Sequence, residues 1–276
     1  MVSRVDFAFM DSGTGGIPYM MELKKKSPSS RCVYLGDTAH FPYGEKTPEQ
    51  VERSAAETIR KIVAKWNPGA LVIACNTISV TALDGLRRQF PSLPIVGTVP
   101  AIRLAARMTR NKRIGLLATN ATVRHPYCKR LIQSFASDCT VYSRGDPDLV
   151  AFVEHDLFTA TAEDRRAAVT PALDYFESND CDTIILGCTH FTHIAQDIQN
   201  AVPEGVSVID SRDGVANQAL RVCPVIGTES GNDMERGAKS LPPDTGFYVT
   251  ALRSEKDSGE YQKLSSHFRI PWCGVL

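Results

Sequence analysis

The chain has 276 residues, of which 43% are hydrophobic and 22% are charged, a composition typical of a globular protein with enough apolar material for a sizeable core. Thirty-one basic side chains balance thirty-one acidic ones, so the charge pattern predicts neither a nucleic-acid partner nor an acidic membrane surface. Apolar runs such as residues 70–74 and 183–186 are far too short to span a bilayer.

Short apolar segments alternate with longer amphipathic stretches along the chain. We predict strands at residues 5–10, 31–35, 70–75, 94–99, 113–119, 140–144, 183–188, 207–210 and 247–251. Helical periodicity is visible between them, for example over residues 48–66, 78–90 and 163–177. Near-continuous apolar strands separated by helices are typical of parallel sheets that are covered on both faces. The predicted fold class is therefore α/β.

No low-complexity linker divides the chain, so any domain boundary must be a short crossover. We expect one α/β domain from residues 1–99 completed by 211–276, and a second α/β domain, inserted over 100–210. In open parallel sheets, ligands bind beyond the carboxyl ends of the strands. Functional side chains are therefore expected at those ends.

The eight cysteines are widely spaced in a chain that is not small, which argues against a disulfide scaffold. The N-terminus runs from Arg4 and Asp6 directly into a strand-like segment, so no secretory signal is visible. We therefore expect reduced thiols in the cytoplasm.

Two cysteines share one local setting. Cys75 and Cys188 each follow an apolar strand and precede polar residues that open a helix, one in each expected domain. The N–H groups at a helix N-terminus favour a thiolate over a thiol, which suits a reactive cysteine. A cysteine that ends a strand can also be a small buried side chain without function. The matched settings favour function for this pair.

A histidine follows the second cysteine closely. His190 is a candidate to exchange a proton with Cys188 or with a substrate, or else an exposed residue at a helix start. Together with His193, these residues are of types that bind zinc, but the sequence offers no convincing fourth ligand. We therefore predict no metal site.

The first predicted strand leads into the sequence DSGTGG at residues 11–16 and then into a helical segment. A glycine turn before a helix is a natural anion site. The Lys-Ser/Thr pair of a P-loop is missing, and the spacing does not fit a dinucleotide fingerprint cleanly. We predict a carboxylate-sized anion as the ligand; a tight turn in which Asp11 and Ser12 cap the helix is the alternative.

Further polar or aromatic side chains follow two other predicted strands. Pro42 and Gly44 predict a turn that could present Tyr43 to a cleft. Thr119 and Thr122 place hydroxyl groups at another strand end. Each of these signals is weak by itself. Because all of them follow a predicted strand, together they favour a functional site at the strand ends.

Taken together, these segments resemble the glutamate racemase family, within the aspartate/glutamate racemase superfamily. The matching pieces are DSG-x-GG at 11–16, LGD at 35–37 with PYG at 42–44, CNT at 75–77, T-x-x-T at 119–122 and LGCTH at 186–190. They occur in the family's order and at its approximate spacing. The resemblance implies two similar parallel-sheet α/β domains with the active site in the cleft between them. It also implies cofactor-independent interconversion of L- and D-glutamate, which supplies D-glutamate for peptidoglycan, by a homodimer.

The resemblance implies a two-base mechanism, in which one thiolate removes the α-proton and the opposite thiol delivers a proton to the other face. Cys75 would act on the D-enantiomer and Cys188 on the L-enantiomer, assisted by Asp11 and His190 respectively. Glu154 lies where the family has a further acidic residue near the cleft. The positions that would hold the substrate are Ser12, Pro42, Tyr43, Gly44, Asn76, Thr77, Thr119, Thr122 and Thr189.

The chain also departs from the family pattern. Ile78 replaces a small residue, Ala121 a glycine, and Thr192-His193 a Pro-Leu pair, while residues 248–252 only partly match the family's Thr-Gly-Asp ending. These changes bear on pocket size. Alternatives are therefore a racemase of aspartate or of a hydantoin, or a non-catalytic amino-acid-binding protein on the same scaffold.

Overall fold

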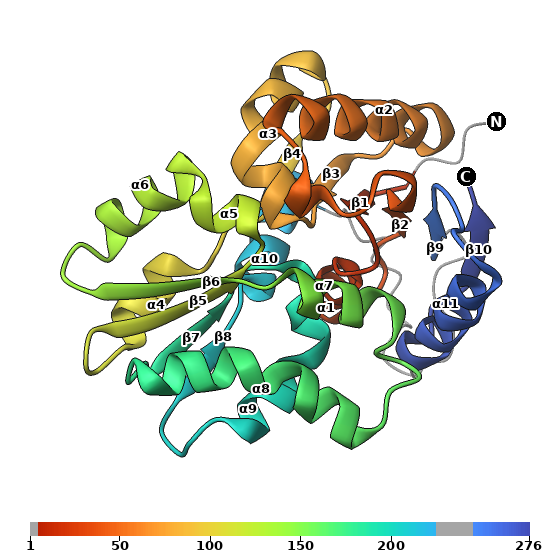
Figure 1. Cartoon of the computed structure of the whole chain (residues 1–276). Helices are drawn as coiled ribbons and strands as arrows, with labels where there is room; N and C mark the ends of the chain where they lie inside the picture. Colours follow the sequence, from red (N-terminus) through yellow and green to blue (C-terminus); the bar gives the residue numbers. More distant parts are fainter. Residues whose placement is uncertain (1–4, 225–244) are drawn as a thin grey trace, which may run out of the picture.

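The structure, a computed structural model, describes residues 5–224 and 245–276. In these residues the strands form two sheets, and every strand pairing is parallel (Figure 1). The six-stranded sheet has the order β10-β9-β2-β1-β3-β4, and the four-stranded sheet has the order β6-β5-β7-β8. The prediction of two parallel-sheet α/β domains is confirmed.

The strands of the larger sheet are β1 (Phe7–Asp11), β2 (Cys32–Gly36), β3 (Ala70–Ile73), β4 (Ile95–Gly97), β9 (Gly246–Val249) and β10 (Trp272–Val275). Those of the smaller sheet are β5 (Arg113–Ala118), β6 (Thr140–Gly145), β7 (Thr183–Leu186) and β8 (Ser207–Ile209). The strands thus divide between the sheets as 7–97 with 246–275, and 113–209. This division supports the boundaries expected at 99/100 and 210/211, which stay a prediction.

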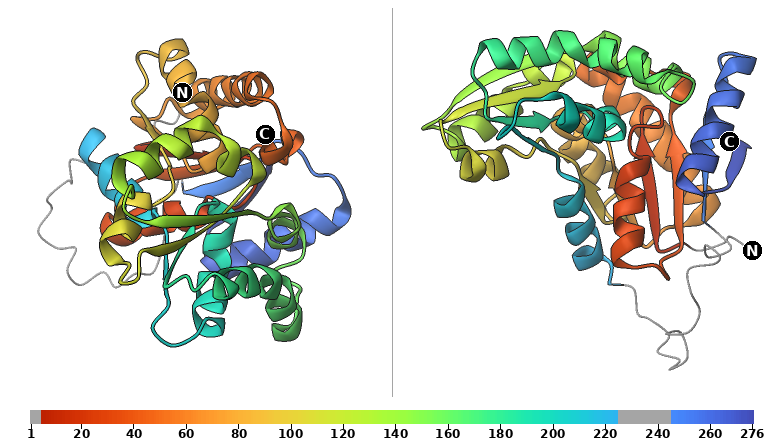
Figure 2. Two further views of the ribbon diagram at one scale, coloured as in Figure 1. Left: turned by 60° about the vertical axis from the view of Figure 1, so that its left-hand side comes forward. Right: turned by 90° about the horizontal axis from the view of Figure 1, so that it is seen from below.

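Helices cover both sheets (Figures 1 and 2). They are α1 (Ile17–Lys26), α2 (Pro48–Trp66), α3 (Asn76–Gln89), α4 (Ile102–Met108), α5 (Asn120–Arg124), α6 (Pro126–Phe135), α7 (Pro147–His155), α8 (Ala162–Ser178), α9 (Ala195–Ala201), α10 (Arg212–Val222) and α11 (Glu255–Phe268). Short 3-10 helices are η1 (Thr38–His40), η2 (Tyr43–Glu45) and η3 (Thr189–Ile194). None of the described helices is long and apolar enough to cross a membrane.

Helix α2 shows how local sequence sets an element. Its N-cap Thr47 accepts a hydrogen bond from the backbone of Gln50, whose side chain accepts one from the backbone of Thr47. This reciprocal capping box, with Pro48 in the first turn, starts the helix at the predicted residue. The helix buries Val51 and Ile59 in the core against the first sheet.

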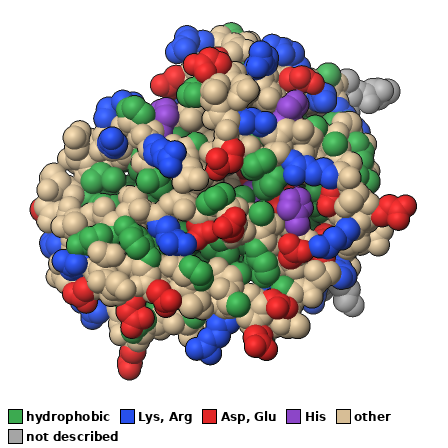
Figure 3. Space-filling view, in the orientation of Figure 1, with side chains coloured by type: hydrophobic (Ala, Val, Ile, Leu, Met, Phe, Trp, Pro, Cys, Tyr) green, Lys and Arg blue, Asp and Glu red, His purple; other side chains and the backbone are tan. Residues whose placement is uncertain are grey.

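Nine predicted strands correspond to β1–β9, and β10 was missed. The side chains of β10 alternate between partly buried and exposed, and the strand lies at the edge of the sheet with an irregular register against β9. β10 is also short and contains Gly274 at positive φ, which interrupts the pattern of an extended strand. On the face that Figure 3 shows, acidic and basic side chains are interspersed, in keeping with their equal numbers.

Candidate active site

The carboxyl ends of the two sheets face one cavity of about 50 Å³. The predicted site residues in its wall are Ser12, Pro42, Tyr43, Gly44, Cys75, Asn76, Thr77, Thr119, Cys188, Thr189 and His190. Two predicted residues, Asp11 and Thr122, are fully buried just behind this wall. The wall also includes six residues that the sequence did not single out: Phe41, Glu45, Asn120, Pro147, Val150 and Ala151.

Cys75 is the N-cap of α3, directly beyond β3, and is 4% exposed. Burial raises the pKa of its thiol well above the ordinary value, and the neighbouring Asp11 carboxylate raises it further. The Ile78 backbone N–H at the helix start acts in the opposite direction but is outweighed. The expectation that the helix N-terminus would favour a thiolate is therefore wrong for Cys75, because burial dominates.

Asp11 is the last residue of β1, and its side chain contacts both Cys75 and Thr189, the residue that follows Cys188. Its carboxylate accepts hydrogen bonds from the Ser12 backbone at 2.6 Å and from the Thr189 hydroxyl at 2.9 Å, and it also contacts the Cys75 thiol. Burial raises its pKa, and the nearby positive charge of His190 opposes that rise. The alternative in which Asp11 and Ser12 cap α1 is wrong, because the N-cap is Gly16 and makes no side-chain capping bond.

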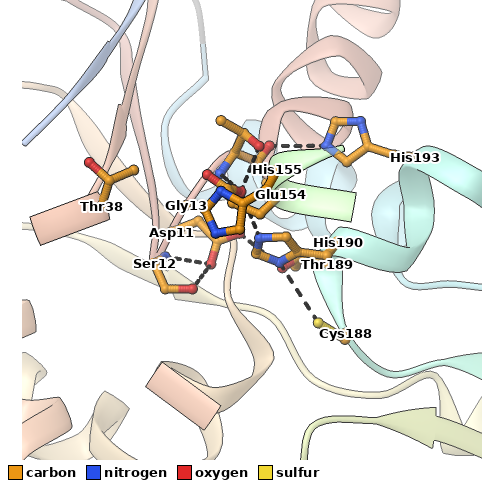
Figure 4. Close-up of polar contacts among 12 residues, drawn as sticks. Asp11, Ser12, Gly13, Thr38, Glu154, His155, Cys188, Thr189, His190 and His193 are labelled. Atoms are coloured by element: carbon orange, nitrogen blue, oxygen red, sulfur yellow. Dashed lines mark hydrogen bonds and ion pairs between the residues drawn. The ribbon is translucent and has the colours of Figure 1, made fainter. Parts of the chain in front are cut away.

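His190 lies between Cys188 and Glu154 (Figure 4). Its Nδ1 is 3.9 Å from the Cys188 sulfur, and its Nε2 is 2.9 Å from a Glu154 carboxylate oxygen. Burial lowers the pKa of His190, but the bonds to Cys188 and Glu154 outweigh it and the pKa lies well above its usual value. An imidazolium ring therefore donates to both neighbours. The alternative of an exposed His190 is wrong, since the residue is 1% exposed.

Glu154, from α7, also occupies the glycine loop of residues 11–16. One oxygen accepts from the Thr14 backbone N–H at 2.8 Å and from its hydroxyl at 2.7 Å. A Cβ on Gly13 would lie 2.5 Å from that oxygen, so only glycine leaves room for it. Burial alone would raise the pKa of Glu154, but the bonds from His190 and Thr14 hold it below its usual value. The carboxylate that Thr14 of this loop binds therefore belongs to the chain itself, and a separate carboxylate-sized ligand for the loop stays a prediction.

Tyr43 lines the cavity, and its hydroxyl bonds to a residue that lies outside the cavity wall. That hydroxyl donates to the buried carboxylate of Asp37. Asp37 also accepts from the Thr250 hydroxyl at 2.9 Å and contacts His40 at 3.0 Å. Thr250 belongs to the C-terminal segment that departs from the family pattern, so this segment supports the cavity wall from behind.

Hydroxyl and amide groups gather beside this part of the wall, where Gly44 approaches Thr119. Thr77 and Thr119 share a hydrogen bond of 3.0 Å across the two domains, and Thr119 donates to Thr122 over the same distance. The Asn76 side chain is 2% exposed, and neither its amide nitrogen nor its oxygen has a hydrogen-bond partner in the described residues. A buried amide without a partner is costly, so Asn76 is well suited to hold a polar ligand in the cavity that it lines.

No group of three or more His, Cys, Asp or Glu in the described ranges is arranged to hold a metal ion. Ile78 is fully buried in the core between α2 and the first sheet and does not line the cavity. The element after Cys188 is the 3-10 helix η3 rather than the start of an α-helix. The two cysteine settings are therefore matched in position but not in helix type.

Comparison with known proteins identifies the class of enzyme to which the chain belongs. A sequence model of Asp/Glu/hydantoin racemases matches residues 20–219, so the chain is an isomerase of the racemase class. The chain is 35% identical over 273 residues to the glutamate racemase of Treponema pallidum, covering 99% of this chain and 97% of that protein. It is 38% identical over 210 residues to that of Proteus mirabilis, covering 75% and 72%. The chain belongs to the Asp/Glu/hydantoin racemase family.

Solved structures agree with this assignment. The structure of Escherichia coli glutamate racemase in complex with L-glutamate and the activator UDP-MurNAc-Ala has a TM-score of 0.81 and 27% identity, covering 99% of this chain and 97% of that one. The Thermus thermophilus glutamate racemase in complex with β-chloro-D-alanine has a TM-score of 0.73 and 28% identity, covering 98% and 95%. The two-domain arrangement is thus shared along nearly the whole chain.

Proposed function

We propose that the chain interconverts L- and D-glutamate without a cofactor, by proton transfer between two cysteines and the α-carbon. The observation that carries the proposal is that Cys75 and Cys188 line one cavity from different domains. Each has its own acid/base neighbour, Asp11 for Cys75 and His190 for Cys188. The curated relatives with this overall sequence are named glutamate racemase, which supports glutamate as the substrate.

The surroundings of the cysteines suggest how L-glutamate would react. The Cys188 thiolate, paired with the His190 imidazolium, removes the α-proton and becomes a thiol. The Cys75 thiol, whose proton is retained because its pKa is raised, then delivers a proton to the opposite face and becomes a thiolate. The reverse direction exchanges these roles, with Asp11 accepting the Cys75 proton first.

The developing negative charge on the substrate carboxylate needs fixed donors, since the α-hydrogen is a very weak acid. The Thr77 and Thr119 hydroxyls and the unpartnered Asn76 amide are placed to supply them. Residues of both domains form the cavity wall, among them Cys75 from the first and Cys188 from the second. We therefore infer that the domains separate to admit glutamate and close around it.

We further propose that the enzyme works in the cytoplasm, as a homodimer, and that its D-glutamate is used in peptidoglycan synthesis. These points follow from the family resemblance. Light scattering of the purified protein tests the dimer, and D-glutamate auxotrophy after deletion of the encoding gene tests the use of the product.

Proton exchange in deuterated water tests the central proposal. Purified protein is incubated with L-glutamate and no cofactor, and the reaction is followed by circular dichroism and by deuterium incorporation at the α-carbon. We expect both signals to change. If neither changes with glutamate, a panel with aspartate and a hydantoin distinguishes another racemase from a binding protein, which would show thermal stabilisation by the ligand without exchange.

A further inference from the structure

His193 links the second domain to the glycine loop of the first, outside the cavity wall. It belongs to η3, and its Nε2 lies 3.1 Å from the carbonyl oxygen of Thr14 (Figure 4). A carbonyl can only accept a hydrogen bond, so Nε2 carries the proton. The other ring nitrogen, Nδ1, is buried and has no hydrogen-bond partner within residues 5–224 and 245–276. The ring therefore acts as a neutral donor to one backbone group.

The surroundings keep this ring neutral. Burial lowers the pKa of His193 to about 3, the Thr14 carbonyl opposes that shift, and the positive His190 adds to it. Glu154 and His267 also face the ring, and their effects oppose one another. Near neutral pH the ring therefore neither gains nor loses a proton, which excludes a role as a general acid or base there.

Thr14 is held on both sides by residues of the second domain. Its N–H and hydroxyl donate to Glu154, and the same Glu154 oxygen contacts His190 at 2.9 Å. Its carbonyl accepts from His193. The loop that contains Thr14 begins with Asp11 and Ser12, so the position of Thr14 constrains both of these site residues.

Aromatic rings fix the direction in which His193 points. The ring of Phe158, between α7 and α8, is 5.9 Å away, and that of Phe268, at the end of α11, is 5.4 Å away, both edge to face. His267 contacts both of these phenylalanines, at 5.5 and 4.8 Å. A leucine, the residue of the family pattern here, could fill such a space but could not donate to Thr14.

We propose that His193 is a positioning residue: its bond to the Thr14 carbonyl holds the glycine loop against η3 in the closed state and so sets Asp11 and Ser12 relative to Cys188. This inference rests on the proposed racemase function. Given the separation of the domains that we infer for substrate entry, the bond forms again at each closure. Losing it lowers the population of the closed state and therefore weakens apparent binding of the substrate.

The test compares His193→Leu and His193→Gln with the wild type, and uses His125→Leu as a matched control. His125 bonds a backbone N–H at 3.2 Å at the start of α6, away from the cavity wall. We expect His193→Leu to raise KM for both glutamate enantiomers roughly 2- to 10-fold, as the loss of one hydrogen bond implies, with a smaller effect on kcat. His193→Gln, which keeps a side-chain N–H donor, should restore KM, and His125→Leu should leave it unchanged.

The proposal would be overturned if folded His193→Leu kept the KM of the wild type, or if His193→Gln had the same raised KM as His193→Leu. A change in the shape of the pH profile of activity in either variant would also overturn it. A purely structural role would lower the melting temperature without moving KM. If the wild type does not racemise glutamate, the proposed function fails separately. Hydrogen exchange of the amides of residues 12–16 would then still test the positioning role of His193. The exchange should be faster in His193→Leu than in the wild type and in His193→Gln, and equal rates would contradict that role.

Discussion

Gly15 has no side chain at a point where the first domain meets η3. A Cβ there would lie 2.3 Å from the His190 ring nitrogen Nδ1 and 2.7 Å from the His190 backbone nitrogen. The ring could turn away, but the backbone nitrogen could not. Ordinary contacts begin at 3.4 Å, so loop and η3 would have to separate by about 0.7 Å (3.4 − 2.7). Gly15 is not among the glycines with positive φ, so space alone opposes alanine.

We therefore expect Gly15→Ala to damage catalysis more than folding. Overpacking of this kind costs about 1–3 kcal/mol of stability. A displacement approaching 1 Å at the His190–Cys188 pair can lower kcat/KM by about 100-fold. Circular dichroism with L- and with D-glutamate measures the rate, and urea unfolding measures the stability.

Gly259→Ala is the matched control. Gly259 lies in α11 with nothing within 4 Å of an added Cβ, so we expect unchanged activity and a gain in stability of roughly 0.5–1 kcal/mol. Wild-type kcat/KM in Gly15→Ala would refute the reasoning, because it would show that the closed contact between the loop and η3 is not needed for turnover.

Further predictions concern the thiols, the buried carboxylate and one helix cap. Cys75→Ser and Cys188→Ser should each abolish racemisation; near-native turnover in either variant would contradict the two-base assignment. Because the pKa of Glu154 is lowered on folding, its ionised form stabilises the fold above its usual pKa of 4.5, and that contribution is lost as pH falls through the lowered value. Urea unfolding of wild type and Glu154→Gln should therefore differ most near neutral pH and converge in acid; a constant difference would count against the ion pair. Thr47→Ala should cost about 1 kcal/mol by urea unfolding with kcat unchanged, and no loss would mean that the capping box is dispensable.

Local sequence patterns were enough to predict the class of fold and, together with the family resemblance, most of the residues that line the cavity. Strands β1–β9 could be found from their apolar or β-prone runs, including the half-exposed edge strand β6, whereas the short β10 contains Gly274 at positive φ and left no clear run. Parallel strands place their carboxyl ends at one edge of a sheet, so the sequence could group the side chains at the ends of each sheet. Cys75 and Cys188 follow strands of different sheets, and it is the packing of the two sheets that brings them to one cavity.

The tertiary structure alone decided the electrostatics of that cavity. Glu154 binds Thr14 across 140 positions of the chain, and no local pattern links two residues so far apart. The same is true of the contact between His193 and Thr14. The pKa of Cys75 depends on how completely neighbouring elements exclude water, which outweighs the helix start that its sequence reveals. Residue types at strand ends thus identify the candidate groups, while packing between the domains determines which of them carry charge and which are held in place.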